Sequence, residues 1–179
     1  VLPPPAYAPP KRAKGEFSGD VSDLYRMVER LECESKQIDA AILLMKKQLY
    51  GKAFDILDQY LFRENFSCLE QAHYLRAYGY YKSIPDEDDA RLLGAERMLQ
   101  DVLVSFPKSE LVPFAYTAIG MINVALKNPA AAEGYFNIVK QGYPKYPGMP
   151  EVHFYMAEIY TAKGHNDKAL EYYKQVFES

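Results

Sequence analysis

Few side chains in this sequence are suited to acid–base or metal chemistry, since the 179 residues include three histidines. His73 and His153 stand at corresponding places in two copies of a helical repeat, which favours helix packing over metal binding. His165 is followed by Asn166 and Asp167, and helix capping is the simpler role for such a turn. Phosphate-binding glycine loops, the His-Glu-x-x-His zinc motif and the Gly-x-Ser-x-Gly nucleophile motif do not occur in the sequence. We therefore expect no enzymatic activity, no metal and no cofactor.

The two cysteines, Cys33 and Cys68, are too few for a disulfide framework or a four-thiolate zinc site. Cys33 lies between two glutamates, and no neighbouring positive charge favours its thiolate, so a reactive cysteine is not expected. The acidic loop at Pro85–Asp89 lacks the glycine and the spacing of a calcium-binding loop. We interpret it as a solvated loop.

The overall composition excludes two further classes of protein. Lys and Arg number 21 against 24 Asp and Glu, and a net charge of −3 argues against a nucleic-acid-binding protein. No stretch of about 18 consecutive apolar residues occurs, so no transmembrane segment is expected. Aromatic residues are frequent, with 16 Tyr and 9 Phe but no Trp.

The first 18 residues form a proline-rich segment. Five of the 12 prolines lie within residues 1–10, a composition typical of extended polyproline II chain. We interpret residues 1–18 as a flexible tether, and the alternative is a ligand for a proline-recognising module. The small basic cluster of Lys11, Arg12 and Lys14 is more consistent with solvation of the tether than with phosphate binding.

A long helix is predicted next, because neither glycine nor proline occurs between Gly19 and Gly51. Apolar residues recur over Val21–Leu49 at alternating steps of three and four, interrupted by Ser35, which is a heptad pattern. The pattern predicts one helix of about 30 residues, of which 19–34 is an N-terminal helical extension. Two interpretations remain open: the helix packs back onto the following helices, or it forms a self-associating coiled coil and a homo-oligomer.

A repeat of paired helices follows, and prolines mark its joints. Pro107 and Pro113 stand 37 residues before Pro144 and Pro150. The same register fits two consecutive helical segments, which indicates a duplicated two-helix unit. Small residues are expected where the helices cross closely, namely Ala41, Ala77, Gly120 and Ala157 in the first helices and Ala53, Ala95, Ala132 and Ala169 in the second helices.

This unit resembles the tetratricopeptide repeat, most clearly over residues 153–177. Met156, Ala157 and Tyr160 match the large, small and aromatic positions of the first helix, and Gly164 matches the turn. The resemblance implies an all-α fold, a right-handed superhelix of about four helix-turn-helix repeats preceded by the long N-terminal helix. The repeat domain would span residues 35–179, divided at about 35–66, 67–109, 110–147 and 148–179.

Within this family, two details resemble members from the bacterial envelope. The joints at Phe106-Pro107 and Tyr143-Pro144 are similar to joints common in such proteins. The loop Lys82–Asp89 resembles an insertion in the repeat-bearing lipoprotein of the outer-membrane β-barrel assembly machinery. A coiled-coil segment before the repeats is similar to that of the Tol-associated periplasmic coordinator. These resemblances imply a periplasmic or outer-membrane-associated location rather than a cytoplasmic one.

The resemblance also implies a binding surface, because the first helix of each pair lines a concave groove in this family. The lining carried over to this sequence is aromatic and apolar with few charges, which is typical of a protein-binding site. Too few lysines and asparagines remain for the family's carboxylate clamp, so we expect an apolar or aromatic segment of a protein or peptide partner. The alternative is that the N-terminal helix or a neighbouring domain fills the groove. The expected lining residues are Tyr74, Tyr78, Tyr81, Lys82, Phe114, Thr117, Met121, Phe154 and Glu158.

The C-terminal helix favours a second hypothesis, that of a structural assembly module. Leu170, Tyr173, Val176 and Phe177 form an apolar helical stripe near residue 179. Repeat arrays need a polar outer face on their last unit. We therefore expect that the natural chain continues or that this repeat face packs on another molecule.

Overall fold

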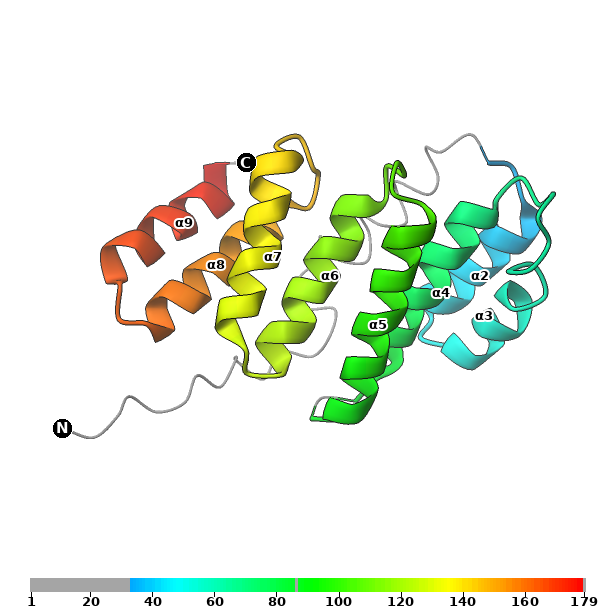
Figure 1. Cartoon of the computed structure of the whole chain (residues 1–179), viewed down its shortest axis with the longest axis horizontal. Helices are drawn as coiled ribbons and strands as arrows, with labels where there is room; N and C mark the ends of the chain where they lie inside the picture. Colours follow the sequence, from blue (N-terminus) through cyan, green and yellow to red (C-terminus); the bar gives the residue numbers. More distant parts are fainter. Residues whose placement is uncertain (1–32, 86, 179) are drawn as a thin grey trace.

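The computed structural model describes residues 33–85 and 87–178, and this part of the chain is all α-helical. Its eight helices lie in consecutive pairs (Figure 1). The prediction of an all-α fold is therefore confirmed. The helices are α2 (Lys36–Lys46), α3 (Tyr50–Leu57), α4 (Leu69–Ser83), α5 (Asp89–Ser105), α6 (Val112–Ala125), α7 (Pro129–Gly142), α8 (Met149–Ala162) and α9 (Asn166–Glu178).

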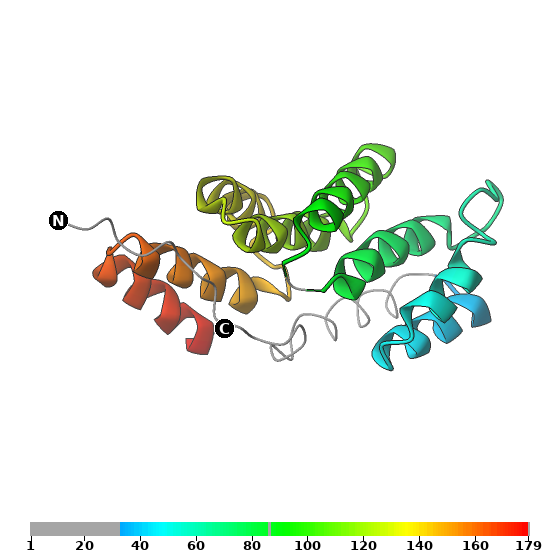
Figure 2. The same ribbon diagram turned by 90° about the horizontal axis from the view of Figure 1, so that it is seen from below.

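The contacts between helices follow the order of the chain. The pairs α2–α3, α4–α5, α6–α7 and α8–α9 each pack together, and α3, α5 and α7 each contact the first helix of the next pair. First helices also contact one another, α2 with α4 and α4 with α6. Seen from below, the successive pairs follow an arc (Figure 2). This pattern of neighbours is consistent with a helix-turn-helix repeat.

The turns inside three of the pairs share one backbone feature, a residue with positive φ. Gln48 (φ 61°), Lys127 (φ 59°) and Gly164 (φ 76°) occupy the turns between α2 and α3, α6 and α7, and α8 and α9. Lys127 and Gly164 are 37 residues apart, which is the period found in the sequence. In the α6–α7 turn, the side chain of Asn128 then accepts a hydrogen bond from the backbone N–H of Ala131 and caps α7.

The joints after α5 and α7 have nearly the same backbone dihedral angles. Phe106 ends α5 with φ −132° and ψ 62°, and Tyr143 ends α7 with φ −135° and ψ 58°. Each precedes a proline, which disfavours helical dihedrals in the residue before it. The Phe-Pro and Tyr-Pro joints therefore stop the second helices at equivalent places.

The small residues expected at the helix crossings are buried. Ala53, Ala95 and Ala132 are fully inaccessible, and Ala169 is 3% exposed. Gly120 of α6 lies directly against the ring of Phe136 on α7, where an added Cβ would approach Cε1 to 2.5 Å. These close approaches explain why the sequence places the smallest side chains at these positions.

The expected continuous helix over Val21–Leu49 is wrong within the described residues. Residues 33–35 are not helical, and α2 begins at Lys36. Ser35, the polar interruption of the heptad pattern, caps α2 by accepting a hydrogen bond from the N–H of Ile38 at 3.3 Å. The helix also stops at Lys46. The tether at 1–18 and most of the extension at 19–34 lie outside the described residues.

The loop expected at Lys82–Asp89 is shorter than predicted. Lys82 and Ser83 belong to α4, and Asp89 is already in α5. The Asp88 carboxylate accepts a hydrogen bond from the N–H of Arg91 and caps α5. Asp88 and Asp89 therefore lie at the start of a helix.

Candidate protein-binding site

The nine residues expected to line a groove lie on α4, α6 and α8, the first helices of three successive pairs. Within each helix they recur at steps of three or four, which places them on one side of that helix. We call this surface the first-helix face. It consists of Tyr74, Tyr78, Tyr81 and Lys82 on α4, Phe114, Thr117 and Met121 on α6, and Phe154 and Glu158 on α8.

On α4, Tyr74 lies at the boundary with the next pair. Its hydroxyl donates a hydrogen bond to the carbonyl oxygen of Phe106 at 3.2 Å. Burial raises the pKa of Tyr74 to about 12, although a hydrogen bond with Ser109 acts in the opposite direction. Further along the helix, the rings of Tyr78 and Tyr81 meet edge to face at 6.2 Å. The aromatic part of α4 therefore continues from the joint to the end of the helix.

On α6, Phe114 makes a ring contact and Thr117 makes a hydrogen bond. The ring of Phe114 packs edge to face on Tyr146 with centroids 4.8 Å apart, and Tyr146 belongs to the joint before α8. The hydroxyl of Thr117 donates to the carbonyl oxygen of Pro113, one turn earlier, at 2.7 Å. Thr117 consequently offers its methyl group rather than a free donor.

On α8, Phe154 and Glu158 lie next to the last helix. The ring of Phe154 contacts those of Tyr155 and Tyr173 at 5.5 and 6.2 Å. The carboxylate of Glu158 accepts a hydrogen bond from the hydroxyl of Tyr173. These contacts give α8 an aromatic surface with one acidic group, whereas α4 carries the basic Lys82.

The first-helix face is buried, and the sequence had left open whether the groove is free or filled. Eight of its nine residues are between 2% and 8% exposed, and Glu158 is partly buried. The sequence identified residues of one type on corresponding helices, but it did not indicate the solvent-exposed fraction of each side chain. Buried apolar residues on all sides of a helix require neighbours on all sides.

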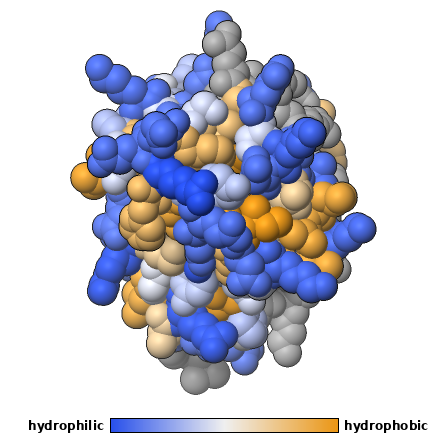
Figure 3. All heavy atoms as spheres, turned by 90° about the vertical axis from the view of Figure 1, so that its right-hand side faces the viewer, coloured by the Kyte–Doolittle hydropathy of each residue, from blue (hydrophilic) through white to orange (hydrophobic). Residues whose placement is uncertain are grey.

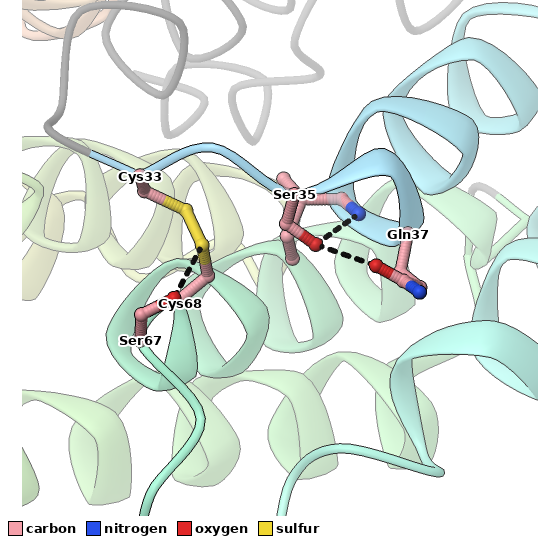
Figure 4. The surroundings of a disulfide bond; sticks show 6 residues. Cys33, Ser35, Gln37, Ser67 and Cys68 are labelled. Atoms are coloured by element: carbon pink, nitrogen blue, oxygen red, sulfur yellow. Dashed lines mark hydrogen bonds between the residues drawn. A yellow bond between two sulfur atoms is a disulfide. The ribbon is translucent and has the colours of Figure 1, made fainter.

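A disulfide between Cys33 and Cys68 was missed in the sequence (Figure 4). Their Cα atoms are 5.5 Å apart, and Cys68 immediately precedes α4. The separation of 35 residues is close to one repeat length, so both cysteines lie just before the first helix of consecutive pairs. This correspondence was a signal that could have predicted the bond.

The histidines take part in packing among the described residues. The Nε2 atom of His73 is 2.9 Å from the carbonyl oxygen of Leu61, and its ring contacts Phe106. The ring of His153 lies 6.1 Å from that of Tyr172. Burial lowers the pKa of His153, and the positive charge of Lys140 lowers it further. Within residues 33–85 and 87–178, no three His, Cys, Asp or Glu side chains converge as a metal site would require.

Comparison of the chain with protein-family models, curated proteins and solved structures finds no match. In the described part of the chain, no helix is both long and apolar enough to cross a membrane. The class defined by fold and site is thus an all-helical protein of paired helices with an aromatic first-helix face.

Proposed function

We propose that this protein is a noncatalytic scaffold of tetratricopeptide-like repeats whose first helices hold an apolar or aromatic segment of a protein partner. The paired helices, the 37-residue period and the small residues at the crossings support the family assignment. In this proposal the pairs continue the arc as a right-handed superhelix, and the first-helix face is its concave side.

The observation that carries the proposal is the alignment of aromatic side chains along successive first helices. Tyr78, Phe114 and Phe154 come from three consecutive pairs, yet they fall on corresponding faces. Aromatic side chains supply large contact areas with little conformational entropy to lose, which suits them to binding. The few charges on this face favour an apolar or aromatic segment over a charged terminus.

A location in the periplasm or at the outer membrane is part of the proposal. The Cys33–Cys68 bond supports it, because structural disulfides persist mainly in oxidising compartments. A cytoplasmic location would keep the two thiols reduced. Free-thiol labelling of the protein in intact cells, with and without a reductant, distinguishes the two locations.

The test of the binding function is capture of partners by the wild type and by Tyr78→Ala/Phe154→Ala, followed by cross-link mapping of the captured segment. We expect the double variant to lose capture and the partner to cross-link to α4, α6 and α8. Phe62→Ala/Tyr135→Ala is the matched control. Phe62 is 89% exposed, and Tyr135 of α7 contacts Tyr116 on the side of α6 that faces α7. Because truncation of buried rings can unfold a protein, helical circular dichroism is recorded, and Phe154→Leu serves as a milder variant. Equal capture by folded face variants and wild type would contradict the proposal.

A second function, self-assembly, is favoured by exposed apolar residues at both ends of the array. Leu170 and Phe177 of the last pair are 54% and 88% exposed, and Leu43 and Leu49 of the first pair are 54% and 42% exposed. The end of the molecule formed by the first pair shows apolar areas among hydrophilic ones (Figure 3). Sedimentation measurements test this function. Leu170→Ser/Phe177→Ser should disperse oligomers joined by the repeat face, and changes at Leu24 and Leu31 should disperse those joined by the N-terminal segment.

A further inference from the structure

The disulfide fixes where residues 1–32 meet the described helices. Cys33 is bonded to Cys68, the residue directly before α4. Tyr74, the first residue of the first-helix face, follows six positions later, or about 9 Å along the helix axis. The segment that precedes Cys33 therefore starts beside one end of the first-helix face.

The burial of α6 indicates an occupant over this face. Twelve of the 14 residues of α6 are buried. Asn123 donates a hydrogen bond to Glu96 at 3.2 Å and thereby marks the side of α6 that faces α5. At about 100° per residue, Phe114 and Met121 point to the opposite side, yet they are 4% and 5% exposed. Tyr146, from the joint before α8, covers part of Phe114. Since α4, α5 and α7 are the described helices that pack closely on α6, we seek the remaining cover of this opposite side in residues 1–32.

The length of the segment is sufficient. Packed helices lie about 8–10 Å apart, so a path from α4 past α6 to α8 is on the order of 20–30 Å. A chain of 32 residues spans roughly 110 Å when fully extended. Residues 1–32 therefore reach α8 even when a large part of the segment is coiled.

The composition of the segment matches the face. Residues 1–10 contain five prolines, and proline-rich chain in the polyproline II conformation binds between aromatic side chains. Such a chain enters a groove with little loss of conformational entropy. Tyr78 and Tyr81 on α4 and Phe154 on α8 supply aromatic rings of this kind.

The order of charges matches as well. Lys82 lies near the C-terminal end of α4, about 21 Å along the helix axis from the entry point at Cys68. Glu151 and Glu158 lie on the same side of α8. Buried charged groups are stabilised by opposite charges. Within the segment, residues 20–23 carry Asp20 and Asp23, and residues 11–14 carry three positive charges. A segment anchored at Cys33 and running towards α8 brings its acidic part to Lys82 and its basic part to the two glutamates.

We propose that residues 1–32 of the same chain occupy the first-helix face, running from α4 towards α8, and that a partner segment binds there by displacing them. The competition with a partner rests on the proposed function, whereas the occupancy itself does not. The segment is then an intramolecular ligand, and the disulfide holds its entry point in place.

Zero-length coupling of the intact, oxidised protein with a carbodiimide tests the occupancy. This reagent joins a lysine amine to a carboxylate as an amide, with loss of water. We expect Lys11 or Lys14 to couple to Glu151 or Glu158. The ion pair of Lys163 with Glu133, whose atoms are 2.6 Å apart, is the internal positive control. Mixing unlabelled and ¹⁵N-labelled chains shows whether each coupled pair lies within one chain. Coupling of the control pair without any from residues 11–14 to α8 overturns the proposal, and so does coupling found only between different chains, which identifies a second copy as the occupant.

A competition experiment measures the strength of the intramolecular contact. The probe is a fluorescent peptide with the sequence of residues 1–20, and the variant is Lys11→Glu/Arg12→Glu/Lys14→Glu in the full chain. A weakened intramolecular ligand leaves the face open more often, so this variant should bind the probe at least fivefold more tightly than the wild type does. The matched control makes the same charge change at three exposed lysines away from the face, Lys52→Glu/Lys145→Glu/Lys174→Glu. Equal affinity of the segment variant and the control for the probe contradicts the proposal.

The two proposals fail in different ways. If coupling to α8 is found but Tyr78→Ala/Phe154→Ala still captures partners, the segment occupies the face and the proposed function is wrong. If coupling is absent but the face variant loses capture, the function stands without an intramolecular ligand.

Discussion

The close crossing of α6 and α7 at Gly120 gives a quantitative test of the repeat packing. Gly120 on α6 faces the ring of Phe136 on α7, and a Cβ built at Gly120 would lie 2.5–2.8 Å from three ring carbons. Phe136 is completely buried, so its ring cannot swing into solvent. We therefore predict that Gly120→Ala forces α6 and α7 apart.

Two effects of opposite sign determine how much Gly120→Ala changes the stability of the protein. Alanine is favoured over glycine inside a helix by about 1 kcal/mol. Overpacking of a tight core contact costs about 1–3 kcal/mol. Gly134 on α7 isolates the first effect, because an added Cβ there meets no atom within 4 Å. Gly134→Ala should stabilise the protein, while Gly120→Ala should be less stable than Gly134→Ala by the overpacking energy.

Thermal unfolding followed by circular dichroism measures this difference. At about 2–4 °C per kcal/mol for a domain of this size, the two alanine variants should differ in Tm by roughly 2–12 °C. Introducing Phe136→Leu should reduce the cost of Gly120→Ala, since the smaller side chain makes room for the methyl group. If Gly120→Ala raises Tm as much as Gly134→Ala does, the close crossing of α6 and α7 is refuted.

Three further predictions concern the disulfide, a turn and pH. Replacing Cys33 and Cys68 together by serine should lower the free energy of unfolding by about 2–4 kcal/mol, because the bond closes a loop in the unfolded chain. Urea denaturation measures this change, and an unchanged free energy of unfolding would show that the bond is not formed. Lys127→Gly should stabilise the protein by about 0.5–1 kcal/mol, since φ is 59° there, whereas Gly164→Ala should destabilise it, and equal Tm values for both would contradict the turn geometry. The folded-state pKa of His153 is lowered below its usual 6.5. The contribution of His153 to stability is therefore complete above about pH 6.5 and is lost as the pH falls through the lower folded-state value. The Tm of His153→Gln should decrease less than that of the wild type between pH 7.5 and 5.5, and an equal decrease would exclude His153 as the cause of the pH dependence.

The local features of the repeat could be predicted from the sequence, because they depend on residue type at fixed spacing. Pro107 and Pro144 mark the joints, Gly164 the last turn and Ala132 a buried crossing, and each lies in the structure where the pattern indicated. Prolines, glycines and alanines restrict backbone or packing directly, so their meaning does not depend on distant parts of the chain.

The features that were missed depend on contacts between distant residues. The heptad pattern continues through Ser35, yet the helix starts after it, because the Ser35 side chain caps α2 and the neighbouring Cys33 is bonded to the start of α4. Periodicity records which residues are apolar, and a cap or a cross-link is invisible to it. The sequence could not decide between an open and a covered first-helix face for the same reason, since no period indicates what lies over a surface.

The disulfide and the first-helix face are linked by their position in the fold. In a stack of helix pairs, the residue before the first helix of each pair lies at the same edge, one repeat apart. A bond between two such residues joins consecutive pairs without disturbing their crossing, which Cys33 and Cys68 achieve with Cα atoms 5.5 Å apart. The same geometry holds any segment that precedes Cys33 beside the start of α4, about 9 Å along the helix axis from Tyr74. Reduction of the bond should therefore weaken two properties together, the stability of the first pair and the local concentration of the N-terminal segment at the face. If the reduced protein keeps the same probe affinity as the oxidised protein while it is less stable, the bond has a structural role alone.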